Sequence, residues 1–244
     1  MTHHLARRIE RAFDTLDRAA ADALCAPHYR EHGAVTDPGP ADRLGAVLTG
    51  LPPDFRYGLE LTLCEGELLV LVGVCEGLPG GPLGAVDLFR VHDGLLVEHW
   101  DALGALPERP FAPLHLRRYE IPAPDSHRRL TERALALLGA EGEFAYAERL
   151  CGRFGAHGYG PRQLRTGTRR LERTVTDGDQ VLLQSTLATA TGPRTEYRLY
   201  DLGREDAPTC WRLTAPQAPV PGVSGVSAVP HGDLRPRPDA VLTH

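Results

Sequence analysis

The sequence contains no lysine and no asparagine, and only two isoleucines. This pattern is typical of a GC-rich genome, so the exclusive use of arginine says nothing about guanidinium chemistry. A formal net charge of −5 and the lack of a basic stripe argue against nucleic acid as a partner. No apolar run approaches the roughly 20 residues of a membrane helix, and residues 1–16 are amphipathic rather than signal-like. We therefore expect a cytoplasmic protein with no membrane partner.

Cysteines are few and irregularly spaced. Their number is odd and they never form a Cys-x-x-Cys pair, which argues against a disulfide framework and a zinc knuckle. A metal site built from His32, His99, Asp87 and Asp101 is conceivable, but no tight ligand spacing such as His-Glu-x-x-His occurs. We expect no metal and no other cofactor.

One segment, residues 86–103 (VDLFRVHDGLLVEHWDAL), is the most informative part of the chain. It predicts a β-hairpin whose second strand ends in His99-Trp100-Asp101. Residues i and i+2 of a strand point to the same face, so His99 and Asp101 share a face with an apolar row. Two ionisable groups in such a row are costly to bury unless paired, and such sites are often functional.

The turn of this hairpin decides which side chains meet. A two-residue loop, Asp93-Gly94, sets Val86 opposite Asp101, whereas a three-residue loop ending in Gly94 sets Asp87 opposite His99 and Ala85 opposite Asp101. The choice matters because a one-residue slip moves every side chain to the other face. We favour the three-residue loop. It gathers Asp87, His99 and Asp101 into one polar cluster. The apolar residues of that face are then Leu83, Ala85, Phe89, Val91, Leu95, Val97 and Leu103. The opposite face receives an Arg90–Glu98 pair beside Trp100.

The chain also carries a repeat. Helical patterns open both halves, at residues 6–16 and 128–138, and strand patterns with an acidic turn follow at 59–74 and 171–187. A His-Gly pair follows an aromatic residue in each half, at Tyr29 to Gly33 and at Phe154 to Gly158. Each half closes on a tryptophan: Phe89 lies 11 residues before Trp100, and Tyr200 lies 11 before Trp211.

Composition predicts the division of the chain. We expect a first domain at 1–106, a Pro-rich linker at 107–125, a second domain at 126–214 and a Pro/Gly-rich tail at 215–244. Each unit runs helix, loop, short helix (41–48 in the first) and then antiparallel strands. That is an α+β pattern, a curved sheet with helices on one face and a pocket between them.

The hairpin, preceded by HYREHG, resembles the SnoaL-like polyketide cyclase branch of the NTF2-like superfamily. The resemblance is specific over residues 5–106 and faint over 126–214. The residues that carry it are Tyr29, His32, Asp87, Phe89, Arg90, Asp93, Gly94, Glu98, His99, Trp100 and Asp101. It implies two tandem NTF2-like (cystatin-like α+β cone) domains, each a curved antiparallel sheet packed with helices. It also implies pairing through the sheets, as an intramolecular pseudo-dimer or a homodimer.

The resemblance implies catalytic roles as well. The acid/base falls on Asp101, and substrate polarisation falls on His99. His32 would bind a substrate oxygen or cap a helix, and Tyr29 and Phe89 would line the pocket. Asp87 would orient His99 or make a purely structural hydrogen bond. The alternative to an acid/base pair is that His99 and Asp101 form a structural pair.

The resemblance implies a cofactor-independent cyclase or isomerase acting on a hydrophobic natural-product intermediate, such as a polyketide. An epoxide hydrolase or cyclase of the polyether type, with Asp87 as a second acid, is one alternative. A non-catalytic binding or scaffold protein is another. The second half has Cys210-Trp211-Arg212 where the first has His99-Trp100-Asp101, so we expect it to be catalytically silent.

Overall fold

The computed structural model describes residues 2–32, 43–106, 126–138, 164–166, 169–190, 192–203 and 209–216. The predicted linker, the Phe154 to Gly158 motif and the tail beyond residue 216 lie outside these described residues. We call residues 2–106 the N-terminal half and residues 126–216 the C-terminal half.

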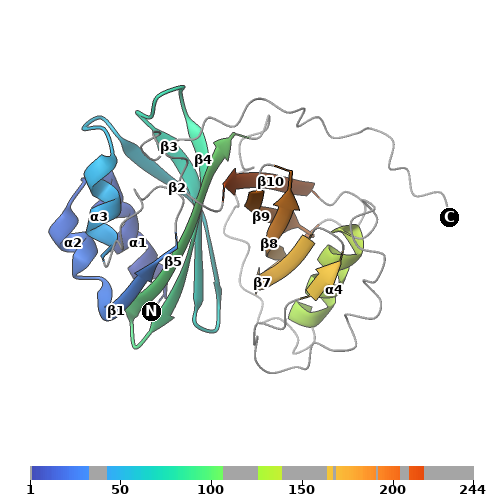
Figure 1. The fold of residues 1–244 in the computed structure, drawn as a ribbon. Helices are drawn as coiled ribbons and strands as arrows, with labels where there is room; N and C mark the ends of the chain where they lie inside the picture. Colours follow the sequence, from blue (N-terminus) through green and yellow to red (C-terminus); the bar gives the residue numbers. More distant parts are fainter. Residues whose placement is uncertain are drawn as a thin grey trace.

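The N-terminal half forms one five-stranded sheet with helices on one of its faces (Figure 1). Its elements are α1 (Thr2–Asp14), α2 (Arg18–Asp22), β1 (Cys25–Glu31), α3 (Leu44–Val47), the 3-10 turn η1 (Leu48–Gly50), β2 (Arg56–Glu65), β3 (Leu68–Glu76), β4 (Leu83–His92) and β5 (Leu95–Ala105). The strand order is β1-β5-β4-β3-β2. The predicted opening helix, the short helix and both hairpins are confirmed.

The C-terminal half forms a second five-stranded sheet, and α4 covers its outer face (Figure 1). Its elements are α4 (Ser126–Leu138), β6 (Leu164–Thr166), β7 (Arg169–Asp177), β8 (Gln180–Thr189), β9 (Gly192–Asp201) and β10 (Thr209–Pro216). The strand order is β10-β9-β8-β7-β6, so β7 to β10 follow one another as β2 to β5 do. The predicted helix at 128–138 and the hairpin at 171–187 are confirmed.

The helices cover the N-terminal sheet because their apolar residues recur at helical spacing. In α1, Leu5, Ile9 and Phe13 are buried one turn apart and join the core beneath the sheet. The helical segment ends where Leu16 takes a positive φ of 52°, and Asp17 caps α2 by accepting a hydrogen bond from the Ala20 amide at 2.9 Å.

Residues 25–31 correct one expectation. We expected a loop between the opening helix and the short helix, but residues 25–31, which include Tyr29, form β1, which pairs with β5 in parallel. The sheet is therefore mixed rather than wholly antiparallel. The pairing sets Glu31 beside His99 and brings a third strand to the functional hairpin.

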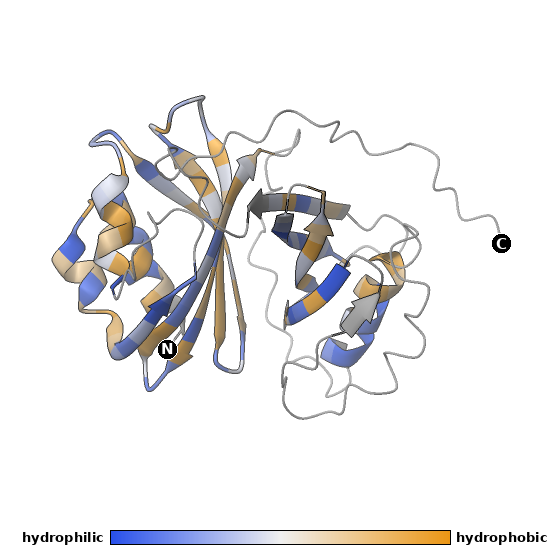
Figure 2. Cartoon of the chain, viewed as in Figure 1, coloured by the Kyte–Doolittle hydropathy of each residue, from blue (hydrophilic) through white to orange (hydrophobic). Residues whose placement is uncertain are grey.

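The two sheets pack face to face, so the chain is built in four layers (Figure 1). Apolar residues lie along the strands of both sheets as well as on the helices (Figure 2). The shared core consists of Leu63, Val70, Val72, Val86, Leu88, Ala102, Val175, Leu182, Tyr197, Leu199, Trp211 and Leu213. Two glycines of the first sheet permit close approach: Gly84 lies under the Trp211 indole and Gly104 under Leu213.

Contacts between the sheets are reciprocal. Glu65 and Asp177 are the last residues of β2 and β7. The Glu65 carboxylate accepts a hydrogen bond from the Thr176 amide at 2.7 Å, and the Asp177 carboxylate accepts one from the Cys64 amide at 2.9 Å. Each half thus makes the contact that the other makes, which is the pattern of a two-fold interface. Both β2 and β7 also carry a bulge at the same place, at Glu60 and Glu172.

Within the described residues, we find no helix that is both long enough and apolar enough to cross a membrane.

The contact between Gly84 and Trp211 predicts the effect of one added methyl group. A Cβ at residue 84 would lie 2.8 Å from the indole, so the Gly84→Ala variant must push the sheets apart. We expect a loss of about 1–3 kcal/mol of unfolding free energy in urea titrations, the usual range for an overfilled core. The matched Gly50→Ala variant, whose Cβ meets nothing within 4 Å, should stay within about 0.5 kcal/mol of the wild type. Equal stabilities for the two variants would contradict this packing.

Candidate active site

The turn of the β4–β5 hairpin is a two-residue loop. Asp93 and Gly94 have positive φ values of 50° and 77°, as both central residues of a type I′ turn require. The three-residue loop that we favoured from the sequence is therefore wrong. His92 lies opposite Leu95, as the shorter loop demands.

A bulge on β5, three residues after Gly94, returns the side chains to the faces of the sheet that the sequence predicts. Val91 pairs with Leu96 but Arg90 pairs with Glu98, so Val97 is an extra residue on β5. Because the bulge shifts the register by one, Asp87, His99 and Asp101 do share a face, as predicted. The pairs within that face differ from the prediction, since Asp87 lies opposite Asp101 and Phe89 opposite His99.

The change of turn and the bulge also explain why the predicted place of Leu95 in the core is wrong. Leu95 is 37% exposed, and Leu96 takes the place in the core that Leu95 was expected to fill. Val97 is buried but belongs to none of the core clusters of the described residues. The predicted Arg90–Glu98 pair is confirmed, at 2.8 Å between guanidinium and carboxylate.

His99 is the centre of the site. Its side chain is 1% exposed, and each ring nitrogen contacts a carboxylate. Nδ1 lies 2.9 Å from Glu31 Oε2 and Nε2 lies 3.1 Å from Asp87 Oδ1. The ring of Phe89 stacks on the imidazole, with centroids 4.3 Å apart and planes 8° apart. Phe89 is fully buried, so the structure places it as a support for His99.

A tyrosine holds each of the two carboxylates. Tyr29 donates its hydroxyl to Glu31 Oε2 at 2.6 Å, and Tyr57 donates to Asp87 Oδ2 at 2.7 Å. Burial, together with the neighbouring carboxylate, raises the pKa of both phenols, so both remain donors. A continuous hydrogen-bonded chain therefore runs from Tyr29 through Glu31, His99 and Asp87 to Tyr57. We call these five residues the His99 network.

The two carboxylates determine the charge of His99. Burial alone would lower the pKa of the imidazole, but the attraction of Glu31 and the hydrogen bonds to Asp87 and Glu31 raise it well above 6.5. His99 is therefore an imidazolium at neutral pH, with both N–H groups donated to carboxylates. It offers no lone pair to a metal ion and no free N–H to a substrate.

Asp101 is the remaining acidic group on this face. It is 9% exposed and lies directly across the strand pair from Asp87, two residues after His99. Cross-strand partners have Cβ atoms about 4.5–5.5 Å apart, so the two carboxyl groups are close neighbours. Both oxygens of Asp87 are held by His99 and Tyr57.

His32 corrects a prediction. We expected it to face the pocket with Asp101, but it follows Glu31 directly and points to the other side of the sheet. There its ring stacks on Trp100, with centroids 4.8 Å apart, and the Arg173 guanidinium of the C-terminal half lies 3.7 Å from the Trp100 centroid. Burial lowers the pKa of His32. This cluster therefore belongs to the interface between the sheets, and a metal site including both His32 and His99 is ruled out by geometry.

Sequence reasoning missed Glu31 and Tyr57. Glu31 lies two residues after Tyr29, a spacing that brings both to one face of a strand, but we expected a loop rather than a strand here. Tyr57 gave no signal beyond its place in a strand pattern. Its link to Asp87 depends on the pairing of β3 between β2 and β4.

The C-terminal half carries the opposite charge at the equivalent face. Arg198 and Arg212 pair across β9 and β10 as Asp87 and Asp101 pair across β4 and β5. The fully buried Glu196 contacts Arg169 and Arg198 at 2.5 and 2.7 Å, and Arg212 at 2.5 Å. Burial would raise the pKa of Glu196, but Arg169 and Arg198 lower it below its ordinary value.

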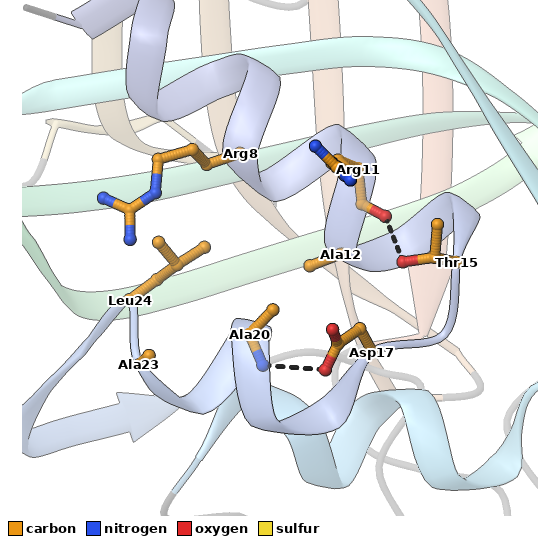
Figure 3. A pocket seen from close by; sticks show the side chains of 8 residues that line it. All are labelled: Arg8, Arg11, Ala12, Thr15, Asp17, Ala20, Ala23 and Leu24. Carbon is orange, nitrogen blue, oxygen red and sulfur yellow. Dashed lines mark hydrogen bonds between the residues drawn. The ribbon is translucent and has the colours of Figure 1, made fainter.

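A hollow of about 260 Å³ lies between α1 and α2 (Figure 3). Its lining residues are Arg8, Arg11, Ala12, Thr15, Asp17, Ala20, Ala23 and Leu24. None of them belongs to the His99 network, and two of its polar groups are engaged locally, Thr15 with the Arg11 carbonyl and Asp17 with the Ala20 amide. The hollow is therefore separate from the site described above.

Comparison with known proteins gives structural neighbours only. No family model matches the chain, and no curated protein matches it. Among solved structures, a "putative polyketide cyclase" from Streptomyces antibioticus is 23% identical, covering 42% of this chain and 91% of its own at a TM-score of 0.36. A "putative ketosteroid isomerase" from Kribbella flavida is 21% identical, covering 50% and 90% at 0.38. An NTF2-like protein of unknown function from Cytophaga hutchinsonii is 16% identical, covering 42% and 89% at 0.36.

These neighbours include NTF2-like proteins and proteins whose names refer to polyketide cyclases and ketosteroid isomerases. Each of the three matches covers half of this chain or less, at a TM-score below 0.4. The function proposed below therefore depends on this chain's own residues and contacts.

The charge of His99 predicts a pH dependence of stability. Because the pKa is raised in the folded state, the contribution of His99 is complete below the unfolded value of about 6.5 and is lost as pH rises through the folded value. Between about pH 6.5 and 8, the wild type should lose about 1–2 kcal/mol of unfolding free energy in urea titrations.

The His99→Gln variant should lose most of this slope, whereas the exposed His28→Gln variant should keep it. A wild-type stability that rises over this pH range, or a slope of undiminished size in His99→Gln, would contradict a buried imidazolium.

Proposed function

We propose that the N-terminal half is a cofactor-independent acid/base enzyme of the cyclase or isomerase type. Its substrate would be a hydrophobic natural-product intermediate with a carbonyl group, such as a polyketide. Asp101 would remove or deliver the proton. The observation that carries the proposal is the placement of Asp101 beside a buried carboxylate–imidazolium–carboxylate chain.

The geometry supports Asp101 as the proton-transfer group for two reasons. The other acidic groups of this face, Glu31 and Asp87, are each held by a tyrosine and by His99. Asp101 is 9% exposed, so it is not wholly enclosed as the His99 ring is. A general base must reach the proton that it removes, and buried carboxyl groups are suited to such work near neutral pH.

His99 would act through its charge. Both of its N–H groups are donated to carboxylates, so it is not placed to take a proton or to bind a substrate oxygen directly. A fixed positive charge in a water-poor site can still stabilise the negative charge that develops on an enolate. This role differs from the direct polarisation that the family resemblance implies.

The surroundings favour an apolar ligand. The face that carries Asp101 also presents Leu83, Ala85 and Leu103, and the buried Phe89 ring stacks on His99. Sites for small molecules combine such apolar walls with a few placed polar groups.

The epoxide-opening alternative is less well supported. It needs a second acid, for which Asp87 was the candidate, but Asp87 accepts hydrogen bonds at both oxygens from His99 and Tyr57. A non-catalytic binding protein would need only the apolar face and would leave the acid/base groups idle.

We also propose that residues 126–214 are a diverged copy of residues 1–106 and serve as a built-in partner. The matched strand order, the matched bulges at Glu60 and Glu172 and the reciprocal hydrogen bonds of Glu65 and Asp177 support this. The arginines at the equivalent face exclude the same acid/base chemistry there.

Proton abstraction can be tested without knowing the natural substrate. We expect the protein to accelerate deuterium exchange at the α-carbon of 1-tetralone, an apolar aromatic ketone, when followed by NMR in D2O. Asp101→Asn should reduce the exchange rate by about 10²–10⁴-fold, the range of general acid/base effects. The matched Asp93→Asn change, at an aspartate whose side chain is 89% exposed, should leave the rate unchanged.

Undiminished exchange in Asp101→Asn would overturn the assignment. A wild-type protein that binds 1-tetralone without exchanging its α-protons would favour the binding protein instead.

A further inference from the structure

We propose that Glu31 is a positioning residue for the site: it keeps His99 as a doubly hydrogen-bonded cation and so keeps Asp87 charge-compensated beside Asp101. The inference rests on the proposed function of Asp101 for its catalytic consequence, but not for the state of His99 itself.

Burial disfavours the charged form of an imidazole. His99 is completely enclosed, and a buried imidazole without a counter-charge gives up its proton. Glu31 is equally enclosed, with 1% of its side chain exposed, and its Oε2 lies 2.9 Å from His99 Nδ1. Asp87 keeps slightly more contact with solvent, at 8%, and its contact is longer, at 3.1 Å. Glu31 is therefore the stronger of the two electrostatic partners.

The position of Glu31 is fixed by its own strand and by the backbone that follows it. It enters the site from β1, which joins the sheet by parallel pairing with β5 and ends at Glu31. The Tyr29 hydroxyl fixes Oε2 from the same strand at 2.6 Å. The backbone locks this placement, because the next residue, His32, donates its amide N–H to the His99 carbonyl at 2.8 Å. A carboxylate fixed by its own strand can orient the imidazole ring of the neighbouring strand.

Glu31 acts on Asp101 through His99 and Asp87. Asp87 and Asp101 are directly opposed across β4 and β5, and neighbouring carboxylates repel each other. The imidazolium contacts Asp87 and offsets its negative charge beside Asp101. Without Glu31, His99 depends on Asp87 alone and its proton becomes labile within the working pH range.

Other groups around His99 do not take over this role. The phenols of Tyr29 on β1 and Tyr57 on β2 are neutral, because burial and the nearby carboxylates raise the pKa of both. On β3, burial and the nearby Asp87 and Asp101 raise the pKa of the Cys75 thiol, so it too is neutral. The charged groups that face His99 within the described part of the chain are Glu31, Asp87 and, on its own strand, Asp101.

The test removes the charge of Glu31 and keeps its size. In the wild type, two-bond proton–nitrogen spectra should show His99 doubly protonated from about pH 6 to 8.5. In Glu31→Gln, His99 should titrate within this range, towards the ordinary value of about 6.5. In the same variant, kcat/KM for 1-tetralone exchange should fall as pH rises. The midpoint of this fall should match the pH at which His99 titrates. A merely structural role would lower the rate evenly and add no ionisation.

The control is Glu67→Gln, which removes the carboxylate 2.8 Å from the exposed His92 and should change neither the His99 signals nor the profile. If Glu31→Gln does not fold, Glu31→Asp keeps the charge but shortens the reach. It should lower the His99 midpoint below the wild-type value, and an unchanged midpoint would overturn the inference.

His99 remaining doubly protonated throughout in Glu31→Gln would also overturn the inference. The nitrogen spectra need no turnover, so they report on Glu31 even where Asp101→Asn shows that the proposed function is wrong.

Discussion

Burying a positive charge is the constraint on which this site depends. An imidazolium removed from water is stable only where opposite charge and hydrogen bonds replace its hydration. His99 meets this requirement with a carboxylate at each ring nitrogen, a tyrosine hydroxyl behind each carboxylate and the Phe89 ring against its face. Such an array is costly to assemble, and removing one member of a buried pair typically costs about 3–5 kcal/mol. In our proposal, the array serves the chemistry beside it.

The fold supplies this array from strands that are distant in sequence. The parallel β1–β5 pairing brings Glu31 to His99, and the bulge at Val97 sets Asp87 opposite Asp101. Behind the sheet, the C-terminal half covers the opposite face through Trp211 over Gly84 and through the stack of Arg173 on Trp100. The equivalent face of the C-terminal half inverts the charge pattern, with arginines around Glu196. In our proposal one half carries the chemistry and the other supports its sheet.

Local patterns predicted the parts of the structure that depend on periodicity. The alternation in residues 86–103 placed Asp87, His99 and Asp101 on one face, and this is confirmed although the assumed turn is wrong. A two-residue turn followed by a bulge puts the same side chains on each face as the three-residue loop does. The cross-strand partners within each face nevertheless differ. Glu31 and Tyr57 could not be predicted, because their contacts depend on which strands become neighbours. His32 was placed on the wrong side because residues 25–31 form a strand, which alternates faces, rather than the loop that we expected.

The central claim is that His99 is a cation shared by Glu31 and Asp87. Neutron diffraction from crystals grown in heavy water near neutral pH locates ring deuterons directly. The account predicts a deuteron on each ring nitrogen of His99, one directed at Glu31 Oε2 and one at Asp87 Oδ1. A bare nitrogen facing either carboxylate, with the deuteron on the carboxyl oxygen or absent, would contradict it.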